Sequence, residues 1–139
     1  MEPIVLAPLP IELKLLGATL ILAVMQILLA ALMRTKQYGR GWNVGARDEA
    51  MPPLAPLPAR LLRAQANLFE TLPLFAAAVL AAAVSGRLGF KTMLGAQLYF
   101  WARLVYVPLY ATGVPVVRTL VWTIALVGLL VVIAGLFLG

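Results

Sequence analysis

The sequence predicts an all-α integral membrane protein, a bundle of four transmembrane helices that forms a single domain over residues 1–139. Two observations indicate this fold class. Hydrophobic residues make up 63% of the chain and charged residues only 12%, about half the charged share of a typical soluble domain. Long apolar stretches also recur along the chain, and a membrane-spanning helix needs ~20 such residues. The length leaves room for about four spans and for no separate soluble catalytic domain.

The helices are expected near residues 11–34, 59–84, 92–110 and 118–138. In the first, Gln26 is the only strongly polar residue between Leu15 and Met33, which is typical of a transmembrane segment. A polar connector follows over residues 35–58. Because it contains several glycines and ends in a proline-rich stretch, we expect a cytoplasmic loop there and no helix.

The later helices differ in polarity. The second is polar in its first half and rich in alanine from Leu72 to Val84. The third contains Gln97 and Arg103, whereas the fourth has no charge between Thr119 and Leu138. The polar second helix therefore needs neighbours on more than one face.

Composition excludes several kinds of site. The chain has no Cys and no His, so disulfides, thiolate metal sites and His-ligated haem are absent. Only five acidic residues remain, and we expect no metal site. A net charge of +6 in so apolar a chain indicates basic loops facing an anionic membrane leaflet, and no nucleic-acid partner is expected.

The basic residues also predict an orientation. Six lie on the side of the first connector and three on the opposite side. The positive-inside rule then makes the connector side cytoplasmic. Both termini would face the periplasm or a lumen. The first side has Arg34, Lys36, Arg40, Arg47, Arg60 and Arg118, and the second has Lys14, Arg87 and Lys91.

Two polar stripes face one another across the predicted bundle. The second helix has Arg60, Arg63, Asn67 and Glu70 within an arc of about 80° at 100° per residue. The third helix has a stripe of Tyr99, Arg103, Tyr106 and Tyr110. The stripes converge in the cytoplasmic half, together with Arg118. A cavity lined by guanidinium, amide and phenol groups is typical of a site for a small anion with carboxylates.

Depth along the helices predicts a contact between Glu70 and Arg103. Glu70 lies ~15 Å below Arg60, and Arg103 lies ~10 Å below Tyr110, at 1.5 Å per residue. We expect this pair to be structural rather than catalytic. Gln65 points roughly 160° away from Asn67 and should face another helix or subunit. The alternative for both stripes is that they serve only as packing contacts between helices.

The residues of the second helix resemble a known family signature. The segment from Arg63 to Pro73 reads R-A-Q-x-N-x-x-E-x-x-P. It is similar to the signature of the MAPEG family, the membrane-associated proteins in eicosanoid and glutathione metabolism. Arg103, Tyr106 and Tyr110, followed by Arg118, resemble that family's third-helix motif and a following arginine. Together with the four-span layout, the resemblance covers nearly the whole chain and is to a bacterial member.

The resemblance implies a homotrimer that binds glutathione between subunits, toward the cytoplasmic side. It assigns glutathione-binding positions to Arg63, Gln65, Asn67, Glu70, Tyr106 and Tyr110. Arg34 is similar to a basic residue at the end of the first helix. Gln65 would contact glutathione from the neighbouring subunit. Arg118 is similar to the arginine that stabilises the glutathione thiolate in catalytic members.

The resulting leading hypothesis is a glutathione-dependent transferase or peroxidase in a bacterial inner membrane. Its substrate would be a lipophilic electrophile or hydroperoxide that arrives through the bilayer, and membrane lipids would surround the protein. Thr71 stands where several eicosanoid-forming members have Tyr, which leaves the substrate open. Two alternatives remain: a non-catalytic lipid- or glutathione-binding scaffold, and a small transporter that uses Glu70. Because arginines surround Glu70, the transporter is the weaker alternative.

Overall fold

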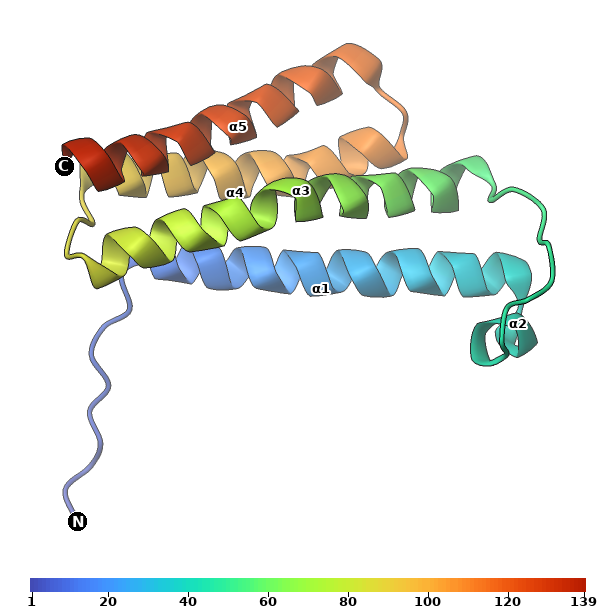
Figure 1. The fold of residues 1–139 in the computed structure, drawn as a ribbon, viewed down its shortest axis with the longest axis horizontal. Coiled ribbons are helices and arrows are strands. Elements are labelled where there is room, and N and C mark those ends of the chain that lie inside the picture. The colour runs from blue at the N-terminus through green and yellow to red at the C-terminus, as the bar shows by residue number, and fades with distance from the viewer.

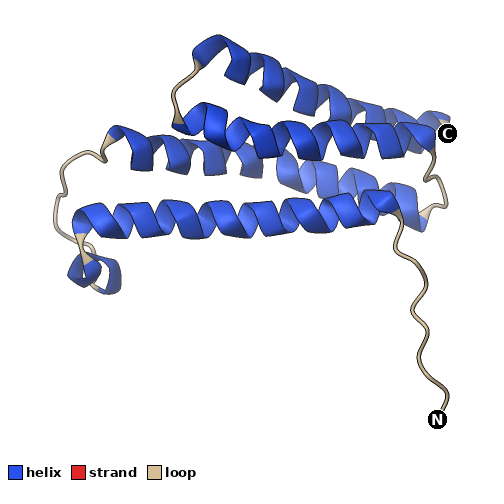
Figure 2. Ribbon diagram, turned by 180° about the vertical axis from the view of Figure 1, so that it is seen from behind, coloured by secondary structure: helices blue, strands red, loops and turns tan.

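The computed structural model describes all of residues 1–139, and it is all-helical with no strand (Figure 2). Four long helices lie side by side, and successive ones run in opposite directions (Figure 1). A short helix, α2, lies in the connector after the first of them. The helices are α1 (Ile11–Tyr38), α2 (Arg40–Val44), α3 (Pro56–Val84), α4 (Phe90–Ala111) and α5 (Pro115–Leu138).

The core lies between the four long helices. Phe75 on α3 and Tyr99 on α4 are both fully buried and stack with their ring centroids 4.0 Å apart. The Tyr99 hydroxyl forms a 2.8 Å hydrogen bond with the Thr71 hydroxyl. The stacked rings and this hydrogen bond join α3 to α4 about midway along the bundle.

Helices α4 and α5 pack most closely because glycines face each other between them. An ideal Cβ on Gly128 would lie only 2.7 Å from the backbone oxygen of Gly95 and 2.7 Å from the backbone nitrogen of Tyr99. Small residues allow this approach of two backbones, as is common between membrane helices. The close packing keeps α5 beside the polar stripe of α4.

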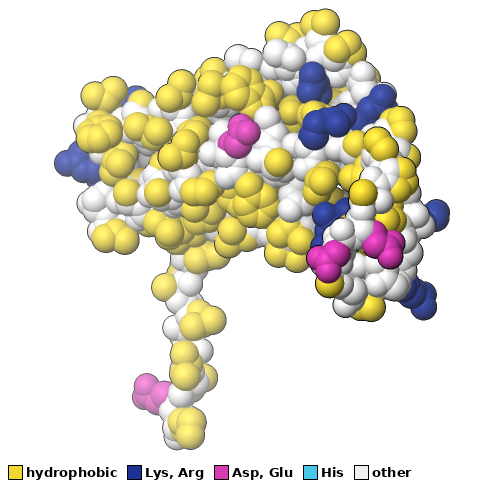
Figure 3. All heavy atoms as spheres, turned by 45° about the vertical axis from the view of Figure 1, so that its right-hand side comes forward, with side chains coloured by type: hydrophobic (Ala, Val, Ile, Leu, Met, Phe, Trp, Pro, Cys, Tyr) yellow, Lys and Arg dark blue, Asp and Glu magenta, His cyan; other side chains and the backbone are white.

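Three of the helices, α1, α3 and α5, are long and apolar enough to cross a membrane. Large apolar side chains are exposed along the sides of the bundle, whereas Lys and Arg gather toward its two ends (Figure 3). The prediction of an all-helical protein with membrane-spanning helices is therefore confirmed. Helix α4 has 22 residues but is more polar, since it contains Lys91 and Arg103.

The connector differs from the prediction. Helix α1 continues to Tyr38, and α2 forms immediately after Gly39, although we expected no helix in residues 35–58. The chain between Arg34 and Val44 contains no proline, so nothing breaks a helix there before Gly39, which has a φ of 94°. The proline-rich part then returns to α1, because Gln37 donates to the Pro53 carbonyl and accepts from the Ala55 amide.

A buried acid joins two helix ends on the opposite side of the bundle. Glu12, in the first turn of α1, is 4% exposed. The Thr92 hydroxyl donates to a Glu12 carboxylate oxygen at 3.0 Å and accepts from the Gly89 amide at 2.8 Å. The carboxylate therefore lies near the N-termini of both α1 and α4, where helix dipoles favour negative charge.

Candidate functional site

The predicted polar stripes of α3 and α4 meet near the end of the bundle that bears the connector. At that end α3 begins, α4 ends and α5 begins, so Arg63, Tyr110 and Arg118 come from three different helices. The Arg63 Nε donates to the Tyr110 hydroxyl at 3.1 Å. The Arg118 guanidinium lies 4.6 Å from the centroid of the Tyr110 ring. Tyr110 thus separates the two arginines and contacts both, an arrangement in which cation–π attraction offsets part of their repulsion.

Arg103 is the most deeply buried charged residue of the site, at 1% exposure. Its Nη1 donates to the Asn67 side-chain oxygen at 2.7 Å, and its guanidinium lies 4.3 Å from the Tyr106 ring centroid. The Nε and Nη2 groups of Arg103 have no hydrogen-bond partner. Within the chain, Arg103 therefore has one hydrogen-bond partner, Asn67, and one cation–π contact, with Tyr106.

The prediction that Glu70 contacts Arg103 is wrong. Arg103 bonds to Asn67, and Glu70 is exposed on the surface of the chain. Glu70 is three residues beyond Asn67, which turns it about 60° around the helix axis. The similar depth of the two residues is compatible with a contact, but the rotation places Glu70 at the surface and Asn67 beside Arg103.

Two cavities lie on either side of Arg118. One, of about 180 Å³, is lined by Asn67, Tyr106, Arg118, Thr119 and Trp122. The other, of about 220 Å³, is lined by Arg60, Arg63, Tyr110, Gly113, Pro115 and Arg118. No Asp or Glu lines either cavity. The electrostatic field in both is therefore that of the arginines, and the groups lining them suit an anionic ligand.

The structure brings most of the predicted site residues to these two cavities. Arg63, Asn67, Tyr106, Tyr110 and Arg118 all line one or both. It adds five residues that were not predicted as ligand contacts: Arg60, Gly113, Pro115, Thr119 and Trp122. A signal for Trp122 was present, because it lies four residues after Arg118 and so on the same face of the helix.

Three predicted residues do not reach these cavities from their own chain. Gln65 and Glu70 line neither. Arg34 lies at the end of α1, where its guanidinium is 5.4 Å from the Trp42 ring centroid and its Nε is buried without a partner. The predicted direction of Gln65, away from Asn67, agrees with its absence from the cavities.

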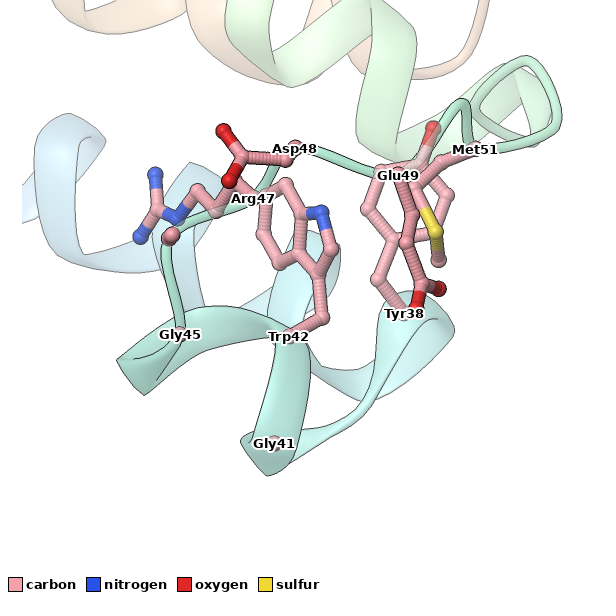
Figure 4. Close-up of a pocket in the computed structure, with 9 residues that line it drawn as sticks. Tyr38, Gly41, Trp42, Gly45, Arg47, Asp48, Glu49 and Met51 are labelled. Atoms are coloured by element: carbon pink, nitrogen blue, oxygen red, sulfur yellow. The ribbon is translucent and has the colours of Figure 1, made fainter.

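The connector encloses a third cavity of about 400 Å³, shown in Figure 4. Its central feature is the Trp42 indole, with Tyr38 on one side and Arg47 on the other. The Arg47 guanidinium lies 4.4 Å from the Trp42 ring centroid and is held by hydrogen bonds to Asn43. Since Arg47 already occupies an indole face, these groups fold the connector and leave little of the ring for a ligand.

Comparison with protein-family models gives one match, the MAPEG family, over residues 15–138. The match leaves out only the first 14 residues and the last. The chain belongs to the MAPEG family. No curated protein and no solved structure matches it. With its three apolar helices, this MAPEG chain is an integral membrane protein, and its membership suggests a glutathione-related activity.

Proposed function

We propose that this MAPEG protein is a glutathione-dependent transferase or peroxidase that acts on a lipophilic electrophile or hydroperoxide. The observation that supports this most directly is the position of Arg118 between two cavities that contain no acid. One cavity offers further arginines for the carboxylates of glutathione. The other offers an amide, a hydroxyl and aromatic rings beside the same arginine.

In the proposed mechanism, Arg118 stabilises the glutathione thiolate and so lowers the pKa of the thiol. Arg63, Asn67, Tyr106 and Tyr110 hold the peptide by hydrogen bonds and ion pairs. In a transfer reaction the thiolate sulfur forms a bond to the electrophilic carbon, and the leaving group departs with the electron pair of the bond that breaks. The thiol proton goes to solvent before this step.

The assembly that we propose is a homotrimer in which a neighbouring subunit completes the ligand site. Support comes from the residues to which the family resemblance gives a ligand contact but that do not line the cavities of their own chain, Gln65, Glu70 and Arg34. From an adjacent subunit, Gln65 and Arg34 would reach the ligand. Native mass spectrometry in mild detergent should give a trimer, and a protein that is only monomeric would contradict this assembly.

The topology that we propose has four spans, with α4 as the fourth, in one domain of residues 1–139. Support comes from its 22 residues, enough for a span, and from its position beside α3 and α5 in the bundle (Figure 1). The connector end would be cytoplasmic and both termini periplasmic, in a bacterial inner membrane. Because the chain has no cysteine, single cysteines at Asp48 and Ser85 can be tested with an impermeant thiol reagent. Intact cells should label only the Ser85 position.

Replacement of Arg118 tests the proposed activity. Arg118→Ala should lower turnover of an aryl halide on the order of 100-fold, by analogy with loss of one oxyanion donor, and should abolish the ultraviolet thiolate absorbance of bound glutathione. Arg87→Ala, at the other end of the bundle, is the control. If Arg118→Ala retains both signals, the role of Arg118 is wrong. If the wild-type protein binds glutathione but shows neither signal, it is a non-catalytic binding protein.

A further inference from the structure

Arg60 lies one turn before Arg63 on α3 and reaches the turn between α4 and α5. Its Nη1 donates to the carbonyl oxygen of Ala111 at 3.4 Å, a long hydrogen bond. A guanidinium has five N–H donors, and this is the only hydrogen bond that Arg60 makes in the structure. The remaining donors are free to bind a ligand in the cavity that Arg60 lines.

The turn is shaped to receive this guanidinium. An ideal Cβ on Gly113 would lie 3.0 Å from the Arg60 Cζ and 3.1 and 3.2 Å from its two terminal nitrogens. Gly113 also has a φ of 76°, a conformation that residues with a side chain rarely adopt. Glycine at this position therefore both permits the turn and leaves room for Arg60 beside the backbone.

The charge in this cavity exceeds what one carboxylate neutralises. Arg60, Arg63 and Arg118 all line it, and no acidic residue does. Arginine pairs with carboxylates through two parallel hydrogen bonds. Three guanidinium groups in a cavity of about 220 Å³ thus favour a ligand that brings more than one negative charge.

The spacing of the polar residues along α3 is compatible with a ligand of tripeptide length. Arg60 and Asn67 are seven residues apart on α3, so they are separated by about 10.5 Å along the axis at 1.5 Å per residue. An extended tripeptide spans roughly 10 Å. This spacing is compatible with a tripeptide that has its central thiol beside Arg118, one end at Arg60 and the other end toward Asn67.

We propose that Arg60 binds one terminal carboxylate of a dicarboxylate thiol tripeptide and selects it over thiols that have a single carboxylate. This inference rests on the proposed function, because it concerns the same site. It adds a specificity-determining residue that contacts one end of the ligand, away from the thiol.

The test compares three ligands on four proteins by isothermal titration in detergent. The ligands are glutathione, its glycyl ethyl ester, and the analogue in which 4-aminobutyrate replaces the glutamyl residue and so removes the α-carboxylate. The proteins are wild type, Arg60→Ala, Arg60→Lys and the control Arg87→Ala. A charge-assisted hydrogen bond predicts that wild type binds one of the two analogues on the order of 10- to 100-fold more weakly than glutathione.

Arg60→Ala should bind glutathione as weakly as wild type binds that analogue, and should no longer distinguish the two ligands. Arg60→Lys should keep part of the discrimination, because it retains the charge but not the two-pronged geometry. The proposal is overturned if Arg60→Ala weakens all three ligands equally, or if Arg60→Lys, folded by circular dichroism, discriminates as wild type does. Absence of glutathione binding by wild type would instead refute the proposed function itself, and this inference with it.

Discussion

Replacing Asn67 with alanine should destabilise the protein by about 1.5–3 kcal/mol, the range for hydrogen bonds to charged groups. The Asn67 oxygen is the only hydrogen-bond acceptor that Arg103 has in the chain, at 2.7 Å. Arg103 is 1% exposed, so water cannot easily replace the lost partner. The cost arises from leaving a buried charge with one fewer favourable contact.

The free energy of unfolding can be measured by titrating the protein from mild detergent micelles with sodium dodecyl sulfate, followed by circular dichroism. Asn67→Asp is the matched variant, because it retains the acceptor and adds a negative charge beside Arg103. It should be at least as stable as wild type. Glu70→Gln should change stability by no more than about 0.5 kcal/mol, as expected for an exposed position.

These variants distinguish the observed partner of Arg103 from the expected one. If Glu70→Gln costs roughly 3–5 kcal/mol, the loss typical of a broken buried ion pair, then the main partner of Arg103 is Glu70 and not Asn67. If Asn67→Ala is as stable as the wild type, the conclusion that Asn67 stabilises the buried Arg103 is wrong.

Three further substitutions have expected effects on the same unfolding measurement. Glu12→Ala should cost about 1 kcal/mol, because it removes the buried carboxylate that accepts from Thr92 near the N-termini of α1 and α4, whereas Glu12→Gln should restore most of this loss. Gly113→Ala should cost roughly 1–2 kcal/mol for its positive φ and should also weaken glutathione binding by displacing Arg60. Gly128→Ala should cost about 1–3 kcal/mol, because its Cβ would push α4 and α5 apart; an unchanged stability would contradict the close packing.

The helical class could be predicted from the sequence because apolar runs of membrane-spanning length have few other uses. The connector could not, because its glycines were read as turns. The structure has a positive φ at Gly39, whereas Gly41 lies inside α2. A glycine permits a turn without requiring one, so composition alone does not decide between a turn and a helix.

Helical periodicity was sufficient to predict which residues of α3 and α4 line the site. It was not sufficient to predict contacts that depend on how each helix is rotated about its own axis. The stripes of α3 and α4 meet because residues three and four apart share a helix face. The partner of Arg103 was wrong, because depth along an axis says nothing about the angle around it. Thr119 and Trp122 were not predicted, because α5 has no charge after Arg118, although Trp122 lies one turn beyond Arg118 on the same face of the helix.

The arginines of the candidate site form two layers, an inner one with Arg103 and an outer one with Arg60, Arg63 and Arg118. The layers differ in how fully their charges are paired within the chain. In the inner layer, Arg103 bonds to Asn67 and stacks on Tyr106, as expected of residues that hold helices together. In the outer layer, the partners of Arg60, Arg63 and Arg118 within the chain are uncharged groups: a carbonyl, Tyr110 and Tyr106. Packing alone does not require three like charges around one cavity, since their mutual repulsion opposes folding. An anionic ligand removes this repulsion, so the outer layer supports a binding site and the inner layer supports its scaffold.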